Sequence, residues 1–332
     1  MRKYLTLTVL FLFFYAFPAC GQMIVGAGYG APAPISVAPG QIATLVVSGL
    51  NIPQGVRAPA GPLPLTLGGV SATLRQISDQ PVPIVEVRPI STCPGASQPA
   101  QAPACATLAA VTVQIPYELI PQCPLCLSPI SVFPAEVFIS VNGQPGTAIE
   151  LNPLADEVHV LTACDMMNTP FSAPPPKNIT GLPCSPMVTH ADGSLVSSAS
   201  PAAVGEELTM WAVGLGQTNP PAATGKPLLS AAPTAQTFSM HFNYSVNALP
   251  TKPYTGQPDV KPPQPLFSGL AAGFPGLYQI NFVVPPQPTQ GIPRCAATVA
   301  APTVASNLTV SVGGAYSFDG AGICVATQIP VD

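Results

Sequence analysis

Residues 205–220, GEELTMWAVGLGQTNP, form the stretch from which the fold of this chain is inferred. Its apolar run has the length of one β-strand, contains the only tryptophan, Trp211, and ends at a Gly-Leu-Gly turn. Glycine takes the positive φ that ends a strand without steric cost. Because both faces of the run are apolar, we expect a strand that is covered on both sides. Trp211 is then either an ordinary core residue or the anchor of a contact with a loop or a neighbouring domain.

A weaker copy of this stretch, GQIATLVVSGLNIP, occupies residues 40–53. Two more blocks recur in the same order: residues 81–119 match 265–285, and AEVFISVNG at 135–143 matches SNLTVSVGG at 306–314. Short apolar runs between glycine and proline turns are typical of β-sandwiches, and the 45 prolines argue against a helical chain. The sequence therefore predicts an all-β protein of two tandem immunoglobulin-like β-sandwiches.

The N-terminus has the layout of a secretory signal peptide. Arg2 and Lys3 precede an apolar stretch at 4–17 and small residues that end at Gly21, as in segments that are removed on export. A retained membrane anchor is the alternative, but the apolar run is shorter than a typical span. The predicted organisation is a signal peptide at 1–21, a linker at 22–34, the first sandwich at 35–163, a proline-rich linker at 164–186 and the second sandwich at 187–332.

Cys20 raises the question of a lipid anchor. The segment Phe17-Pro18-Ala19-Cys20 resembles a bacterial lipobox, in which the cysteine becomes the lipidated first residue, although its phenylalanine and proline fit that pattern poorly. Cleavage after Gly21 without lipidation fits about as well. The chain has nine cysteines, so setting Cys20 apart leaves an even number, which suits disulfides in an exported protein. Both interpretations stay open.

The remaining cysteines predict disulfides rather than a metal or redox site. A reactive Cys-x-x-Cys pair needs a helix N-terminus that lowers the thiol pKa, whereas Cys123 and Cys126 have proline-rich flanks. Structural zinc favours two paired ligand clusters, and the other cysteines are widely spaced. Pairing by proximity gives Cys93–Cys105, Cys123–Cys126, Cys164–Cys184 and Cys295–Cys324. The last pair is the best argued, because it would join a loop of the second module to its final strand.

The sequence shows no set of residues that predicts catalysis or cofactor binding. The histidines are His159, His190 and His241, no Gly-x-Ser-x-Gly elbow is present, and the few acids show no calcium-binding pattern. We therefore expect no enzyme activity, no cofactor and no metal site. Charged residues make up 7% of the chain, with a net charge of -4 and no basic cluster, which argues against nucleic acid as a partner. Membrane contact is expected only through a lipid at Cys20.

Three segments carry a resemblance to a known family: SPAAVGEELTMWAVGLGQTNPP, LFSGLAAGFPGLYQINFVVP and NLTVSVGG. Together they closely resemble the uncharacterised Solibacter-type C-terminal domain of secreted acidobacterial proteins, and more loosely the IPT/TIG-type immunoglobulin-like modules. The resemblance covers about residues 185–325, and residues 35–160 match as a more divergent copy. It implies a β-sandwich in an exported protein, and it brings no known activity.

These observations favour a non-enzymatic exported protein at the cell surface or outside the cell, with a structural, adhesion or interaction role and with surface proteins, extracellular proteins or glycans as partners. A module that binds carbohydrate or another small ligand is the alternative, because sugars stack on exposed aromatic rings. A thiol-active protein that uses Cys123 and Cys126 is a third hypothesis. The candidate ligand or interface aromatics are Trp211, Tyr254, Phe267, Phe274 and Tyr278, which could instead fill the core.

Overall fold

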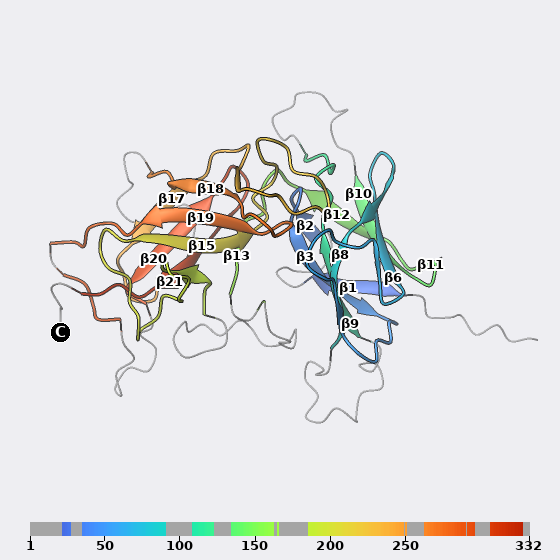
Figure 1. The fold of residues 1–332 in the computed structure, drawn as a ribbon, viewed down its shortest axis with the longest axis horizontal. Coiled ribbons are helices and arrows are strands. Elements are labelled where there is room, and N and C mark those ends of the chain that lie inside the picture. The colour runs from blue at the N-terminus through green and yellow to red at the C-terminus, as the bar shows by residue number, and fades with distance from the viewer. Residues whose placement is uncertain are drawn as a thin grey trace, which may run out of the picture.

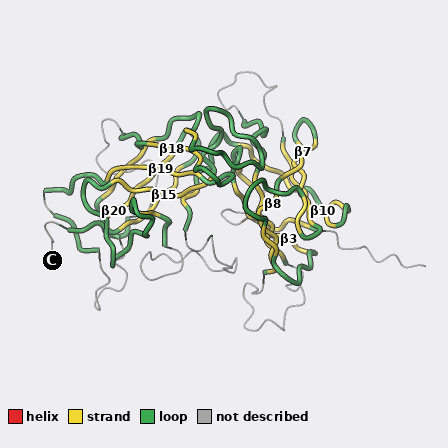
Figure 2. Tube along the Cα trace, viewed as in Figure 1, coloured by secondary structure: helices red, strands yellow, loops and turns green. Residues whose placement is uncertain are grey.

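The computed structural model describes residues 22–27, 35–90, 108–122, 134–162, 165, 185–248, 250, 262–289, 291–295 and 306–327. All regular structure within these ranges is β, with twenty-one strands and no helix (Figure 2). In particular, these ranges contain no helix of the length and hydropathy that crossing a membrane would require. The strands gather into two bodies that follow each other along the long axis of the molecule (Figure 1).

The first body is a sandwich of two sheets around one core. One sheet has the order β1 (Met23–Ala27), β3 (Ile42–Ser48), β9 (Ala109–Gln114), β8 (Ile84–Pro89), β4 (Val56–Arg57). The other has the order β2 (Ile35–Val37), β12 (Ile149–Pro153), β10 (Ala135–Val141), β6 (Val70–Arg75), β5 (Thr66–Leu67), with β7 (Asp79–Val82) on β6 and β11 (Gln144–Pro145) on β10. Neighbouring strands are antiparallel except for β2 and β12, which are parallel.

The second body repeats this plan. Its larger sheet has the order β13 (His159–Val160), β15 (Glu207–Val213), β19 (Tyr278–Val283), β18 (Phe267–Leu270), β16 (Ala232–Pro233), and β14 (Val188–Thr189) also pairs with β15. The smaller sheet has the order β17 (Ser239–Asn243), β20 (Leu308–Gly313), β21 (Phe318–Ile323).

The predicted duplication is visible in the order of the strands. The series β3-β9-β8-β4 in the first sandwich corresponds to β15-β19-β18-β16 in the second, and β6-β10-β12 corresponds to β17-β20-β21. The recurring sequence blocks fall on corresponding strands: β3 and β15, β8-β9 and β18-β19, β10 and β20. The parallel pairing of β2 with β12 also has a counterpart, a parallel bridge between Ala202 and Val325. The prediction of an all-β chain with two tandem immunoglobulin-like sandwiches is confirmed.

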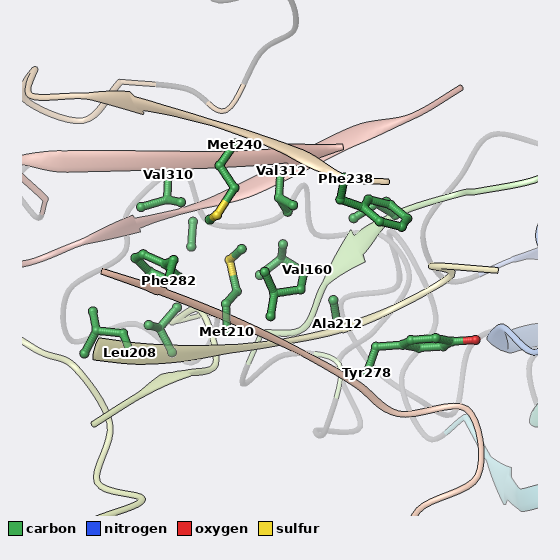
Figure 3. Close-up of a cluster of buried hydrophobic side chains, with 14 of the residues drawn as sticks. Val160, Leu208, Met210, Ala212, Phe238, Met240, Tyr278, Phe282, Val310 and Val312 are labelled. Atoms are coloured by element: carbon green, nitrogen blue, oxygen red, sulfur yellow. The ribbon is translucent and has the colours of Figure 1, made fainter. Parts of the chain in front are cut away.

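Strand β15 shows why the pattern produces this fold. Side chains alternate across a strand, so Leu208, Met210 and Ala212 point together into the core of the second sandwich. Figure 3 shows them facing side chains of the smaller sheet. Trp211 lies half-buried on the other face of β15, where its indole N–H donates to Thr189 Oγ1 of β14 at 3.3 Å. The structure thus places Trp211 outside the core and beside a short neighbouring strand.

Two predicted boundaries differ from the structure. Residues 22–34, predicted as a linker, contain β1, which pairs with β3 and buries Ile24 in the first core. Residues 35–163, predicted as the first sandwich, end in β13, which pairs with β15, and Val158 and Val160 belong to the second core. Both segments are short and lie beside proline-rich sequence, so no alternation marks them as strands. The predicted signal peptide at 1–21 lies outside the described residues.

Candidate functional site

The two sandwiches meet where the turn that follows β15 approaches the segment that connects the sandwiches. At Gly214, which has φ +78°, a Cβ atom would lie 1.8 Å from the carbonyl oxygen of Glu157. At Gly276, which has φ +73°, it would lie 2.7 Å from the carbonyl oxygen of Gly40. No side chain fits at such distances, so glycine allows the backbones to touch. We call this contact region the joint. It comprises the turns at Gly214 and Gly276, the tyrosines Tyr117 and Tyr278, the loop at 224–225 and the connecting segment at 156–158.

Two tyrosines lie at the centre of the joint. The hydroxyl of Tyr117, from the first sandwich, lies 3.1 Å from that of Tyr278 in β19, and Tyr278 donates to the carbonyl oxygen of Gly216. Burial raises the pKa of Tyr117 to about 12 and raises the pKa of Tyr278 well above its ordinary value. Both phenols are therefore neutral donors at physiological pH. Tyr278, a candidate ligand aromatic in the sequence, is fully buried instead and points toward the first sandwich (Figure 3).

A loop of the second sandwich also hydrogen-bonds to the first sandwich. Gly225 donates its N–H to the side-chain oxygen of Gln114 at 2.6 Å and accepts the N–H of Leu63 at 2.8 Å. Thr224 accepts the N–H of Tyr117 at 2.8 Å and donates to Glu118. Directional bonds between the two bodies, added to close packing, hold them in one relative orientation.

The connecting segment is itself bound to the second sandwich. The carboxylate of Asp156 is fully buried and accepts the N–H groups of Ala315 at 3.1 Å, Tyr316 at 3.3 Å and Ser317 at 2.9 Å. The hydroxyl of Ser317 donates to the same carboxylate at 2.9 Å and accepts the N–H of Val158 at 2.6 Å. The connecting segment is thus held against the turn between β20 and β21.

Next along this segment, His159 lies between two carboxylates. Its Nε2 is 3.1 Å from Asp165 Oδ2 and its Nδ1 is 3.3 Å from Asp319 Oδ2. Burial by itself lowers the pKa of His159, but the hydrogen bonds to Asp165 and Asp319 outweigh burial and raise the pKa to about 9. The imidazolium therefore links the connecting segment to β21 at neutral pH.

This arrangement predicts a stability that falls in mildly alkaline solution. The pKa of His159 is raised from 6.5 to about 9 on folding, so its contribution is complete below pH 6.5 and is lost as the pH rises through 9. We expect the free energy of unfolding to fall by up to about 3 kcal/mol over this range. His159→Gln should largely flatten the dependence, measured by urea unfolding at a series of pH values. The pKa of His190 is also raised. His190 is therefore replaced by glutamine both in the protein that keeps His159 and in the His159→Gln variant, so that the two proteins differ only at His159. An equal pH dependence with and without His159 would contradict the assignment.

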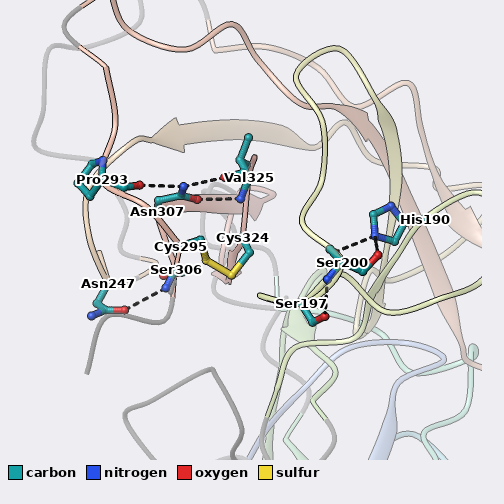
Figure 4. Close-up of a disulfide and its surroundings, with 10 residues drawn as sticks. All are labelled: His190, Ser197, Ser200, Asn247, Pro293, Cys295, Ser306, Asn307, Cys324 and Val325. Atoms are coloured by element: carbon teal, nitrogen blue, oxygen red, sulfur yellow. Dashed lines mark hydrogen bonds between the residues drawn. A yellow bond between two sulfur atoms is a disulfide. The ribbon is translucent and has the colours of Figure 1, made fainter. Parts of the chain in front are cut away.

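A second histidine has neighbours of the kinds found in a catalytic triad. His190 Nδ1 lies 2.5 Å from Glu206 Oε1, and His190 Nε2 lies 3.3 Å from Ser200 Oγ. However, Nε2 also lies 3.1 Å from the carbonyl oxygen of Ser200, which only accepts hydrogen bonds (Figure 4). The hydrogen bond to Glu206 raises the pKa of His190 as well. Both ring nitrogens of His190 therefore face acceptor oxygens, whereas a base for serine needs a free lone pair on Nε2, so this geometry is that of a hydrogen-bonded turn.

The other predicted site residues do not converge on one surface. Phe274 is 61% exposed in the turn before β19, and the neighbouring Gly273 donates to the carbonyl oxygen of Leu228. Phe267 is half-buried on β18 and covers Gly269, whose added Cβ would lie 2.6 Å from its ring. Tyr254 lies outside the described residues. Within the described ranges no cluster of three or more His, Cys, Asp or Glu side chains could hold a metal ion.

Of the four predicted disulfides, only Cys295–Cys324 falls within the described residues, and these two cysteines form a disulfide with a Cα–Cα distance of 5.2 Å (Figure 4). Nearby, Asn307 Nδ2 donates to the carbonyl oxygen of Pro293 at 3.0 Å, and Gln287 donates to that of Ala326 at 2.6 Å. The proline-rich segment after β19 is therefore attached to the sandwich at several points. The other three pairs, and Cys20, lie outside the described residues.

The structure also contains a groove of about 650 Å³ that the sequence did not predict. It lies at the end of the second sandwich away from the joint, because it is formed at the start of β15 and the end of β19, whereas the joint is at their other ends. We call it the distal groove. The one sequence signal for this groove is the apolar run of valine and prolines after β19. Its lining residues are Val204, Gly205, Phe242, Tyr244, Pro263 and residues 283–286.

No protein-family model and no curated protein sequence matches the chain, so the resemblance to the Solibacter-type domain stays a prediction. Three solved structures are similar over 92% of the chain. The Yersinia pseudotuberculosis adhesin InvE is 10% identical with a TM-score of 0.21, and the match spans 59% of its length. The tandem Ig repeats of Dlar are 8% identical with a TM-score of 0.19 over 98% of their length. The C-terminal domain of the Streptococcus agalactiae AgI/II polypeptide BspA is 12% identical with a TM-score of 0.19 over 97% of its length.

Proposed function

We propose that this protein is exported and acts without catalysis, at the cell surface or outside the cell, in a structural, adhesion or interaction role. The observation that carries the proposal is the joint, which combines backbone contact, buried tyrosines and hydrogen bonds between the two sandwiches. Two domains on a flexible linker would bend under load or on contact with a partner. A fixed joint instead lets both sandwiches present a surface as one rigid body.

The positions of the N-terminal strand and the distal groove support this role. Met23 of β1 pairs with Ser48, at the end of β3 that lies away from the joint residue Gly40. The distal groove lies at the far end of the second sandwich. The start of β1 and the ends of β15 and β19 that form the groove thus lie at opposite ends of the molecule (Figure 1). A protein held near its N-terminus, by a lipid at Cys20 or by a partner, would present the groove away from its point of attachment.

Labelling of intact cells tests the proposal. A membrane-impermeant amine reagent should modify the protein on whole cells, and cross-linking should join it to other surface or extracellular proteins or glycans. Cys20→Ser separates the two modes of export, because the variant should pass into the medium if Cys20 carries a lipid and should behave like the native protein if it does not. A protein that stays inside the cell, or that diffuses freely without any cross-linked partner, would contradict the proposal.

A further inference from the structure

The walls of the distal groove are apolar, and several of their polar backbone atoms are already bonded. Gly205 donates its N–H to the carbonyl oxygen of Val284 at 2.9 Å. Val284 donates its own N–H to the carbonyl oxygen of Glu206, also at 2.9 Å. The carbonyl oxygen of Pro285 accepts the hydroxyl of Tyr244 at 2.7 Å, and that of Pro263 accepts the N–H of Met240 at 3.0 Å. The prolines of the walls have no N–H to offer.

This chemistry limits what the groove can hold. A peptide that adds as a β-strand needs a free row of backbone N–H and C=O groups, which walls of proline do not provide. A sugar would bury hydroxyl groups without partners, at a cost of about 1–3 kcal/mol for each. A proline-rich segment in the polyproline II conformation has few N–H groups and keeps its carbonyl groups in solvent. Grooves lined by aromatic rings are the surfaces on which such segments dock.

The groove has the aromatic surface that such a segment requires, in a fixed arrangement. The ring of Phe242 packs near that of Phe282 with centroids 6.0 Å apart, and the hydroxyl of Tyr244 holds its ring against the opposite wall. Burial raises the pKa of Tyr244 to about 12, so its hydroxyl remains a donor at physiological pH. A preformed surface binds with a smaller loss of side-chain entropy.

The charge at the rim of the distal groove indicates which type of residue would lie next to the prolines of a bound segment. None of the lining residues is charged, but Glu207 is exposed and lies directly opposite the groove residue Val283 in the pairing of β15 with β19. A cation at the end of the bound segment would lie near this carboxylate. We propose that the distal groove binds a proline-rich polypeptide segment of a partner protein, in the polyproline II conformation, with a basic residue beside Glu207. This inference names a partner class for the proposed interaction role and rests on it.

Binding is measured on the purified full-length mature protein by fluorescence anisotropy, with a labelled decaproline peptide that ends in lysine. We expect saturable binding that Val283→Lys weakens by about tenfold or more, because the new cation fills the groove and pairs with Glu207. The fold should survive, since Val283 is 41% exposed and opposite charges across two strands are favourable. Leu266→Lys is the matched control: Leu266 is 61% exposed and does not line the groove, so binding should not change. Glu207→Gln should weaken binding about threefold and reduce its salt dependence.

Three outcomes would overturn the inference. The first is an absence of binding at millimolar peptide, and the second is binding that Val283→Lys leaves unchanged. The third is a different occupant: a linear glucan oligosaccharide that binds with the same sensitivity to Val283→Lys, or self-association in sedimentation that this variant abolishes. Because these measurements use purified protein, their failure would leave export and surface location untouched, and a failed cell-labelling experiment would leave binding by the groove untouched.

Discussion

Replacement of Gly214 by alanine is expected to lower the thermal midpoint of the second sandwich by roughly 10 °C. The added Cβ would lie 1.8 Å from the carbonyl oxygen of Glu157, a backbone atom that cannot turn aside. A positive φ costs a non-glycine residue about 1–2 kcal/mol, and the displaced backbone adds about 1–3 kcal/mol more. For a domain of this size, each kcal/mol lowers the midpoint by about 2–4 °C.

Gly273→Ala is the matched control for this prediction. Gly273 has a similar φ of +83°, but nothing lies within 4 Å of its added Cβ. It should therefore show the backbone strain alone, a drop of about half the size by calorimetry. The joint should also loosen only in Gly214→Ala, which small-angle scattering would detect as a broader range of molecular dimensions. Equal drops in the two variants would show that close contact with the connecting segment does not constrain Gly214.

Replacement of Asp156 by alanine should have an effect of similar or larger size, by a different mechanism. The buried carboxylate accepts three backbone N–H groups and one hydroxyl, and the variant leaves these part-buried donors without this partner. Each buried donor that loses its partner costs about 1–3 kcal/mol. We expect the free energy of unfolding to fall by at least about 3 kcal/mol, measured by urea denaturation.

Two further variants separate this effect from the loss of any acid. Asp156→Asn keeps one oxygen for Ser317 but turns an amide toward another donor, so its loss of stability should be intermediate. Asp79→Ala removes an exposed partner of Arg75, and exposed ion pairs contribute little to stability because solvent screens them. If Asp156→Ala were no more destabilising than Asp79→Ala, the connecting segment could not be held by this carboxylate.

The strands that the sequence predicted are those with the longest regular patterns. In β15, β19 and β20 apolar side chains alternate over six or seven residues, and their duplication in the first half made the architecture recognisable. The strands β13 and β14 have two residues each, too few to show alternation. They form because β15 offers backbone partners, which is information from elsewhere in the chain.

The candidate site was much less predictable than the fold. Aromatic residues were chosen for their chemistry, but only the packing of β19 against the first sandwich shows that Tyr278 is buried while Phe274, four residues earlier, is exposed. The groove brings together the start of β15, the end of β17 and the end of β19. No pattern within any one of these segments indicates that the other two are neighbours.

The sequence by itself determined the longer strands, the glycine turns and the duplication, because side-chain alternation and the tolerance of glycine for positive φ act between residues close in the chain. It also indicated the pairing of Cys295 with Cys324. Only the tertiary structure decided the role of Gly214, the burial of Asp156 and the existence of the distal groove. Asp156 and Ser317 meet across 161 positions of sequence, and Tyr117 and Tyr278 also meet across 161. Such contacts depend on how segments far apart in the sequence pack against one another, and no local pattern of side chains specifies that packing.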